Sequence, residues 1–245
     1  MKLESELSIG IIFDGVSSID LGLETLVDRS IGLPNRRPIT VPLPYSNKVL
    51  DLSSYYEETL FEERTLQYDF QLPWFDSKIA LNDFFGRLQR WLYKTNGKVP
   101  LVDGADPTHY YLAEVVNAPT RDEMLTTGNI TVSFTAYPFR IERAAAGDDN
   151  WDTFDFENGI AQSTVFKVTD NKAITLINIS QTEIIPAIKS SSPMTISDGT
   201  TSYDFAAGED DQANAAYQLT LKVGANQFLI SGTGTAEFIW HNEVI

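Results

Sequence analysis

In the first half of the chain, two stretches have the alternating pattern of a β-strand. Every second side chain is apolar in residues 66–72 and again in residues 130–136, and the side chains between them are polar. Successive side chains of a strand point to opposite faces of a sheet, so this period of two is typical of a strand with one buried face. We therefore expect both stretches to be half-buried strands.

Residues 77–93 have the longer period of a helix. Their apolar side chains recur three or four positions apart, which places them on one helical face. These residues are Leu81, Phe84, Phe85, Leu88 and Trp91 or Leu92. Asp76 or Ser77 can cap the first turn, and Asn96-Gly97 provides a stop. The sequence therefore predicts one amphipathic helix here.

The second half of the chain consists of short apolar stretches separated by turn signals such as Ser197-Asp198-Gly199 and Gly232-Thr233-Gly234. The expected strands are residues 164–168, 173–179, 184–189, 194–196, 217–223, 227–231 and 236–240. About seven short strands in about 100 residues are typical of a β-sandwich. We therefore predict a mainly β chain with a sandwich in its second half.

Charge and composition divide the chain near its middle. Residues 1–143 carry 14 basic and 20 acidic residues, a net charge of −6, whereas residues 144–245 carry 4 and 14, a net charge of −10. Residues 144–150 are small and acidic, with no apolar period, which indicates a linker. We expect a first domain at 1–143 and a second at 151–245.

The overall composition excludes several classes of function. The 245 residues have a net charge of −16, which disfavours general binding to nucleic-acid phosphates. The chain has no cysteine, so disulfides, thiolate zinc sites and cysteine nucleophiles are excluded. We find neither a secretory signal nor the roughly 20 apolar residues of a membrane span. We expect synthesis in a cytoplasm and no membrane partner.

The sequence contains few candidates for catalysis or metal binding. The two histidines, His109 and His241, lack a metal-ligand spacing, and no phosphate-binding loop or serine-nucleophile elbow is present. Asp148-x-Asn150-x-Asp152 begins like a calcium loop, but Thr153 stands where the turn needs glycine. We expect no catalytic, metal or cofactor site. A cell-wall glycosidase stays open as an alternative, because 34 acidic residues offer many possible carboxylate pairs.

Sugar binding needs only an exposed aromatic platform with polar neighbours. Trp151 and Tyr203 are the candidates in the second half. Trp240 lies on an alternating strand, where a large aromatic side chain is more often part of the core.

A proline-rich segment at residues 33–45 interrupts the strand pattern of the first half. Proline lacks the N–H that a central strand donates, so this segment is expected to be an extended arm or an edge hairpin. Its characteristic residues are Pro34, Arg36, Arg37, Pro38, Pro42 and Pro44.

Several stretches, taken in their order and spacing, resemble the distal tail protein (Dit) family of siphophages that infect Gram-positive bacteria. The resemblance covers most of residues 1–143 and less of residues 144–245. It includes the Asp14-Gly15-x-Ser17 turn after an apolar strand. The stretches are residues 11–18, 23–38, 49–53, 61–66, 134–139, 224–228 and 238–240.

This resemblance implies a fold and a set of partners. The expected fold is mainly β with two domains: an N-terminal β-sandwich with one helix and an extended hairpin, and a C-terminal galectin-like or carbohydrate-module-like β-sandwich. The N-terminal domains would form a hexameric ring, possibly stacked in pairs, at the tip of a virion tail. The ring would join the major tail protein to the tail-associated tip protein, while the C-terminal domains hold receptor-binding or baseplate proteins.

The resemblance also gives the proline-rich segment a role. A closed ring needs head-to-tail interfaces, and an extended arm that reaches the next subunit makes one. Arg36 and Arg37 would then meet acidic surface on that neighbour. The alternative is a surface loop that covers its own sandwich. DNA would pass through the channel without specific binding, because an acidic wall repels phosphate. The rival function is a carbohydrate-binding protein that recognises host cell-wall sugars through Trp151 or Tyr203.

Overall fold

The computed structural model divides the chain into two compact units. The first unit contains Met1–Arg140 together with Ile245, and the second contains Ile141–Val244. The described residues are 10–23, 25–53, 59–116, 119–123, 128–147 and 159–245.

The domain limits expected from composition stay predictions. The first expected domain ends at residue 143, and the first compact unit ends at Arg140. Residues 148–150 of the expected linker lie outside the described residues, as do residues 151–158 at the start of the expected second domain.

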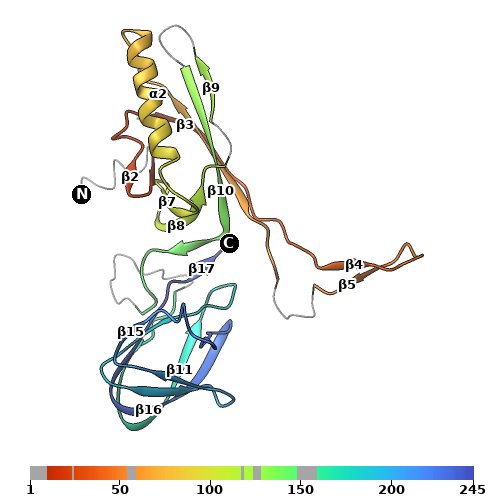
Figure 1. Ribbon diagram of the computed structural model, residues 1–245, viewed down its shortest axis with the longest axis vertical. Helices are drawn as coiled ribbons and strands as arrows, with labels where there is room; N and C mark the ends of the chain where they lie inside the picture. The colour runs from red at the N-terminus through yellow and green to blue at the C-terminus, as the bar shows by residue number, and fades with distance from the viewer. Residues whose placement is uncertain (1–9, 24, 54–58, 117–118, 124–127, 148–158) are drawn as a thin grey trace. The chain divides into compact units, whose positions relative to one another are not determined.

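The first unit is built on one hydrogen-bonded sheet (Figure 1). Its strands are β1 (Ile11–Phe13), β2 (Val16–Ser17), β3 (Thr25–Ile31), β6 (Arg64–Gln71), β7 (Val99–Asp103), β8 (Asp106–Glu114), β9 (Thr120–Glu123) and β10 (Gly128–Glu142). They lie in the order β2-β1-β7-β8-β10-β6-β3, and β9 pairs with β10. β6 and β10 confirm the two strands that alternation predicts, with Phe134 opposite Leu66.

The predicted helix is confirmed as α2 (Lys78–Leu92). The Ser77 side chain caps it by accepting a hydrogen bond from the Ala80 N–H at 3.2 Å. The apolar stripe is the buried face of the helix: Leu81, Phe84, Phe85, Leu88, Trp91 and Leu92. Helical periodicity therefore identified both the element and the face that it buries.

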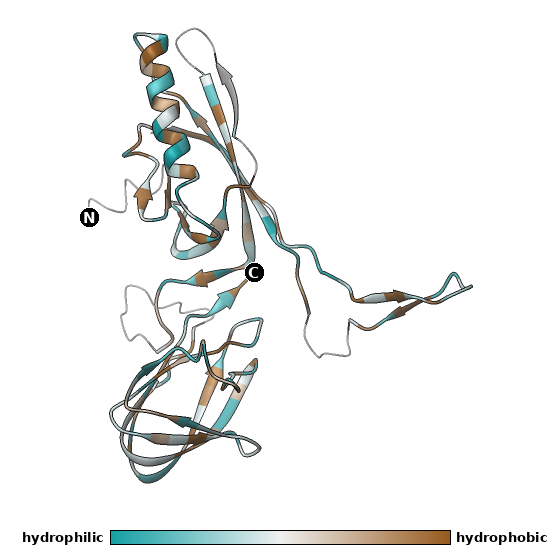
Figure 2. Cartoon of the chain, viewed as in Figure 1, coloured by the Kyte–Doolittle hydropathy of each residue, from teal (hydrophilic) through white to brown (hydrophobic). Residues whose placement is uncertain are grey.

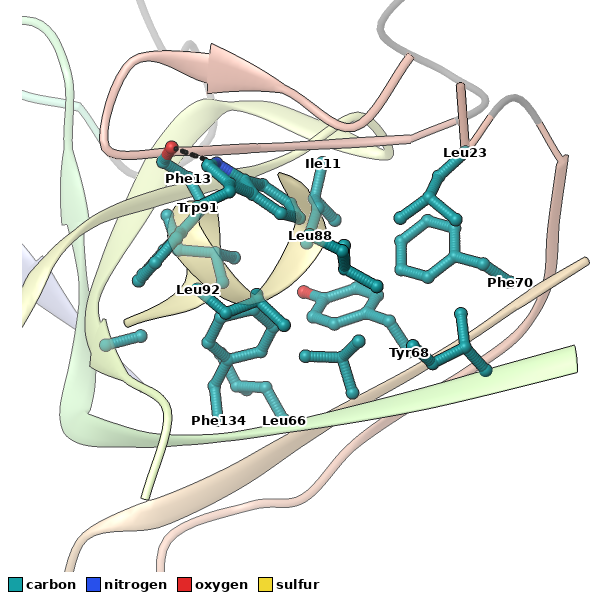
Figure 3. Close-up of a cluster of buried hydrophobic side chains, with 14 of the residues drawn as sticks. Ile11, Phe13, Leu23, Leu66, Tyr68, Phe70, Leu88, Trp91, Leu92 and Phe134 are labelled. Carbon is teal, nitrogen blue, oxygen red and sulfur yellow. Dashed lines mark hydrogen bonds between the residues drawn. The ribbon is translucent and has the colours of Figure 1, made fainter. Parts of the chain in front are cut away.

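The core of the first unit lies where the sheet curls round this helix (Figure 3). Phe13 on β1 and Phe134 on β10 are separated by two strands in the sheet order, yet their ring centroids are 5.0 Å apart. The Trp91 indole N–H donates to the Phe13 carbonyl at 3.1 Å. Two strands that are not neighbours in the sheet thus contribute side chains to a common core, which the curvature of the sheet brings together.

The proline-rich segment forms a hairpin of β4 (Thr40–Pro42) and β5 (Val49–Asp51), a separate two-stranded sheet (Figure 1). The helix, the strands and this hairpin together confirm the expected mainly β class of fold. No helix within the described residues is long and apolar enough to cross a membrane.

The second unit is organised around one long strand. Its strands are β11 (Val165–Asn178), β12 (Ala187–Ser190), β13 (Met194–Ser197), β14 (Ser202–Phe205), β15 (Gly208–Asp210), β16 (Gly224–Ile239) and β17 (Glu243–Val244). β16 pairs along one edge with β11 and along the other with both β13 and β12, which carry β14 and β15. Its core includes Leu176, Ile188, Ile196, Ile230 and Phe238, each at most 1% exposed.

The expected turn at Gly232-Thr233-Gly234 is wrong, and so is the expected break between residues 168 and 173, because both lie inside continuous strands. The expected strands at 164–168 and 173–179 are parts of β11 (Val165–Asn178), and those at 227–231 and 236–240 are parts of β16 (Gly224–Ile239), apart from single residues at their ends. Gly232 and Gly234 have φ values of 139° and 150°, so they change the course of β16 without leaving the pairing with β11. A side chain at Gly234 would collide with the hydroxyls of Ser191 and Ser192.

The expected strand at 217–223 is also wrong, although its burial pattern is right. Leu219 and Leu221 are fully buried, but apart from an isolated bridge between Leu221 and Ile184 the backbone bonds here are made by side-chain amides. The Leu219 N–H donates to Oε1 of Gln212 at 2.6 Å, and the Lys222 N–H donates to Oδ1 of Asn226 at 2.8 Å. Alternation reports which side chains are buried, not what the backbone bonds to.

The bounds of the other strands in the second unit differ from the expected bounds at a few positions. The expected strand at 184–189 begins later, as β12, and Ile184 makes only an isolated bridge to Leu221. The strands β14 and β15 follow the confirmed turn at Ser197-Asp198-Gly199 and had no alternating pattern to announce them.

Candidate functional site

The hairpin and its flanking residues project as an element that we call the hairpin arm, residues 33–53. Backbone pairing continues beyond the two short strands, because the Leu52 N–H donates to the Ile39 carbonyl at 2.8 Å. The Arg37 N–H donates to the Leu60 carbonyl, also at 2.8 Å. The hairpin arm is therefore a two-stranded ribbon along most of its length.

The structure distributes the predicted arm residues along this ribbon. Pro34 and Pro38 precede β4, Pro42 is its last residue, and Pro44 lies in the turn that follows. Arg36 forms an isolated bridge with Phe61, and its neighbour Arg37 makes the backbone bond to Leu60; both arginine residues are exposed. Prolines hold the backbone extended, so less conformational entropy is lost when such a ribbon docks.

Apolar residues lie along β4 and β5, where they are coloured brown in Figure 2, and their side chains are exposed. The exposed fractions are 46% for Val41, 55% for Val49, 48% for Leu50 and 109% for Tyr45. An isolated two-stranded hairpin is marginally stable in water, and clustered exposed apolar side chains mark interaction surfaces. The hairpin arm therefore has the composition of a surface that a partner covers.

Charge adds a second property to this surface. Residues 33–53 contain three basic side chains, Arg36, Arg37 and Lys48, against the single acidic Asp51, in a chain of net charge −16. A basic, apolar ribbon on an acidic chain is complementary to the surface of the same chain.

An ion pair between a buried carboxylate and a partly exposed arginine joins two strands of the first unit. The carboxylate of Asp103, whose side chain is 1% exposed, accepts a hydrogen bond from Arg29 at 3.0 Å. It also accepts the Tyr68 hydroxyl at 3.3 Å and the Ala105 N–H at 2.9 Å. Burial, with the nearby Asp103 charge, holds the pKa of Tyr68 far above its ordinary value. Tyr68 therefore stays protonated as a donor to this carboxylate.

A second cluster surrounds Asp106. Its carboxylate lies 2.8 Å from Nδ1 of His109 and 2.9 Å from Nη1 of Arg140. Burial alone would raise the pKa of Asp106, but the hydrogen bond and charge of His109 and the charge of Arg140 outweigh it and lower the pKa to about 2. His109 thus serves as a partner of a carboxylate, and His241 contacts the Glu142 carbonyl at 2.9 Å.

An open pocket of about 400 Å³ is lined by Asp103, Asp106 and their arginine partners, together with Arg64 and Tyr111. Arg64 is 4% exposed and donates to the carbonyls of Gly32 and Pro138. Burial lowers its pKa, and its guanidinium lies 5.2 Å from the Tyr111 ring centroid. Because each carboxylate here already has a cationic partner, the arrangement ties strands together and leaves little charge for a ligand. No group of three or more His, Asp or Glu among the described residues could hold a metal ion.

The aromatic residues considered for sugar binding differ in their placement and exposure. Tyr203 is half-buried on β14 and lines a pocket in the second unit. Trp151 and the calcium-like fragment at 148–152 lie outside the described residues. Trp240 is 3% exposed, so it belongs to the core as its strand pattern indicates.

The sequence does not predict one of the residues that line this pocket. Tyr217 is 79% exposed and lines the same pocket as Tyr203. It lies in the segment that alternation assigned to a strand, where the expected role of an aromatic side chain is packing. Only the amide contacts of Gln212, which come from the fold, reveal this segment as a loop.

These features define a class of protein: a two-unit, mainly β protein with a projecting basic and apolar hairpin. No family model matches the sequence, and no curated protein matches it. Among solved structures, the chain is similar to SPP1 Dit (gp 19.1), described as a paradigm of the hub adsorption apparatus in phages that infect Gram-positive bacteria.

The likeness extends over both chains almost completely. It covers 96% of this chain and 99% of SPP1 Dit, with a TM-score of 0.65 and 13% sequence identity. At this identity the comparison establishes the fold. It confirms, at the level of fold, the resemblance to distal tail proteins that the sequence shows.

Proposed function

We propose that this chain is a structural protein of a phage virion, a distal tail hub at the tail tip. The observation that carries the proposal is the fold likeness to an adsorption-apparatus hub protein over 96% of the chain, which includes both units. Fold alone does not fix function, so the surface must agree with it. The hairpin arm agrees, because it is an exposed interaction surface in a chain to which we assign no catalytic role.

In this proposal six copies form a ring through their first units. The hairpin arm of each copy docks on the acidic surface of the next, with Leu50 and Tyr45 covered and Arg37 paired. Exposure of both strands of the ribbon supports this over the alternative of a loop that covers its own sandwich. A head-to-tail contact of this kind closes when six rotations complete a circle.

The remaining partners follow from the position of such a ring. The major tail protein would contact one face and the tail-associated tip protein the other, while the second unit holds a receptor-binding or baseplate protein. DNA would cross the channel without specific binding, since the chain carries a net charge of −16. The protein would be made in the bacterial host cytoplasm and act in the virion.

Sedimentation of the purified full chain tests the assembly and the role of the hairpin arm together. We expect a species of about six times 27.4 kDa, or twice that for stacked rings. Leu50→Asp and Arg37→Glu should shift this species toward the monomer. The matched controls are Ile79→Asp, at a 75% exposed apolar position on α2, and Arg87→Glu on the same helix. A ring that survives both arm substitutions would overturn the role of the hairpin arm.

A further inference from the structure

The strand β11 forms an edge of the hydrogen-bonded sheet in the second unit. Within the described residues it pairs with β16 alone, along its whole length from Val165 to Asn178. A strand at the edge of a sheet presents a row of backbone N–H and carbonyl groups, to which a further extended strand can bond. With 14 residues, β11 is much longer than the very short edge strands with which proteins avoid such pairing.

The backbone bonds of β16 show which residues of β11 face this edge. Thr235 of β16 stands opposite Lys167 in the register, but its N–H and carbonyl bond to Ser191 on the other side of β16. Opposite residues of an antiparallel pair alternate between bonding each other and pointing away from each other. Lys167 and every second residue after it therefore direct their backbone groups to the edge. These residues include Asn171, Ala173, Thr175 and Ile177.

Side chains of the second unit already occupy both ends of this edge. Gln162 bonds the Ile177 N–H at 2.9 Å and the Ile177 carbonyl at 2.7 Å. At the other end the Lys167 carbonyl accepts a hydrogen bond from Lys172 at 3.2 Å. Between these two positions, the edge-facing N–H and carbonyl groups of residues 171–175 have no partner in the part of the chain that the structure describes. We call residues 171–175 the open edge.

Charge indicates which kind of strand the open edge accepts. Residues 144–245 contain four basic residues, and two of them, Lys167 and Lys172, lie on β11, where Asp170 is the only acidic residue. No carboxylate of the described residues pairs with Lys172, whose ammonium group lies 5.5 Å from the centroid of the Phe166 ring. Lysine on an edge strand discourages pairing between identical edges, whereas it attracts a strand that carries a carboxylate. The open edge is therefore suited to an acidic segment of a different protein.

An added strand would place one of its side chains directly opposite Lys172. The edge-facing backbone groups belong to residues 171, 173 and 175, so Lys172 would stand at a position of the new ladder that is not hydrogen-bonded. Opposite side chains approach each other most closely at such positions. A glutamate of the added strand would thus lie beside the ammonium group of Lys172.

We propose that the open edge of β11 binds an extended, acidic segment of a partner protein as an additional antiparallel strand. The pairing would match the rest of the sheet, in which every strand pairs antiparallel. Backbone groups of β11 supply the affinity, and Lys172 selects a carboxylate at the opposite position. The inference deepens the proposed function, on which it rests, because it names the contact through which the second unit holds a protein partner.

Amide hydrogen exchange of the full chain, read residue by residue, tests whether the edge is open. The N–H groups of Ala173 and Thr175 should exchange at least about a hundredfold faster than those of Ile174 and Leu176, which face β16. Equally slow exchange of all four would show that the edge is already paired and would overturn the proposal.

The probe for binding is a synthetic peptide of seven residues that alternates threonine with valine and has one glutamate in place of a valine. It should bind and slow exchange at Ala173 and Thr175. A peptide with lysine in place of the glutamate should bind about threefold more weakly. The control peptide is methylated on the backbone nitrogens that form the ladder and should not bind. Failure of the glutamate peptide to bind, or equal binding of the methylated one, would contradict strand addition.

A charge reversal then locates the added strand. The full chain with Lys172→Glu should bind the lysine peptide about threefold better than the glutamate peptide. Lys189→Glu, at an exposed position on β12, is the matched control and should keep the wild-type preference. An unchanged preference in Lys172→Glu would place the peptide elsewhere and overturn the assignment. The ring is read separately by imaging, so rings without peptide binding refute this inference alone, and peptide binding without rings refutes the hub alone.

Discussion

The two units bond their polar side chains in different ways. The first unit pairs opposite charges, as in Arg29 with Asp103 and Arg140 with Asp106. The second uses neutral amides, among them Asn178, Gln212 and Asn226, which bond to backbone groups of loops. Ion pairs between strands respond to protonation, whereas amide bonds to the backbone do not. We therefore expect the first unit to depend on pH and the second to depend on the exact shape of a few side chains.

The largest effect is expected for Gln212→Ala. The substitution leaves the Leu219 N–H and the Pro186 carbonyl without their partner in a buried position, which costs about 3 kcal/mol. Hydrogen exchange should show faster opening of the second unit and no change in the first. Gln227→Ala, at an exposed position on β16, is the control. Equal loss of protection in both units would contradict the separation of the two networks.

The next largest effect is expected for Asp103→Ala in the first unit. The change removes the acceptor of Tyr68 and Ala105 and the partner of Arg29, which costs about 2 kcal/mol. Denaturant unfolding measures this loss, and Asp83→Ala on the exposed face of α2 provides the baseline. A wild-type midpoint for Asp103→Ala would show that this ion pair adds no stability.

A smaller effect, dependent on pH, is expected for Asp106→Asn. The pKa of Asp106 falls from 3.8 to about 2 on folding, so its contribution to stability is present above 3.8 and is lost as the pH falls through about 2. We expect the variant to be about 1 kcal/mol less stable than the wild type at neutral pH. Thermal unfolding across this pH range should show the difference shrinking in acid. A difference that stays constant would contradict the charge-based account.

The smallest effect is expected for Lys94→Ala, which removes an exposed ion pair. Lys94 lies 3.2 Å from Asp14, but its side chain is 67% exposed. Exposed pairs contribute about 0.5 kcal/mol or less, because water and salt screen them. A loss near that of Asp103→Ala would mean that burial does not decide which charges of the first unit matter.

The contrast between the units also explains which elements the sequence could predict. Residues 77–93 form a helix because their spacing and the Ser77 cap act within a few residues. Residues 217–223 have an equally regular pattern, yet the backbone there bonds to the side-chain amides of Gln212 and Asn226, which flank the segment. Local periodicity carries information on burial, whereas individual polar side chains outside the apolar pattern decide the partner of the backbone.

The same limit applies to the candidate site. Four prolines in residues 33–45 predict an extended ribbon, because their restricted backbone is a property of each residue. Tyr217 could not be recognised as a pocket residue, since its exposure depends on Gln212 and on the strands β14 and β15. Gly232 and Gly234 likewise predict a turn from the sequence, and only their pairing with β11 shows that they lie inside a strand.

Negative-stain imaging of the purified full chain tests the central claim most directly. A distal tail hub should appear as closed rings of six subunits around a central channel, seen as sixfold top views. We expect such rings for the wild type and their loss in Leu50→Asp. Single, unassociated particles at every concentration would contradict the proposal that this chain is a ring-forming hub.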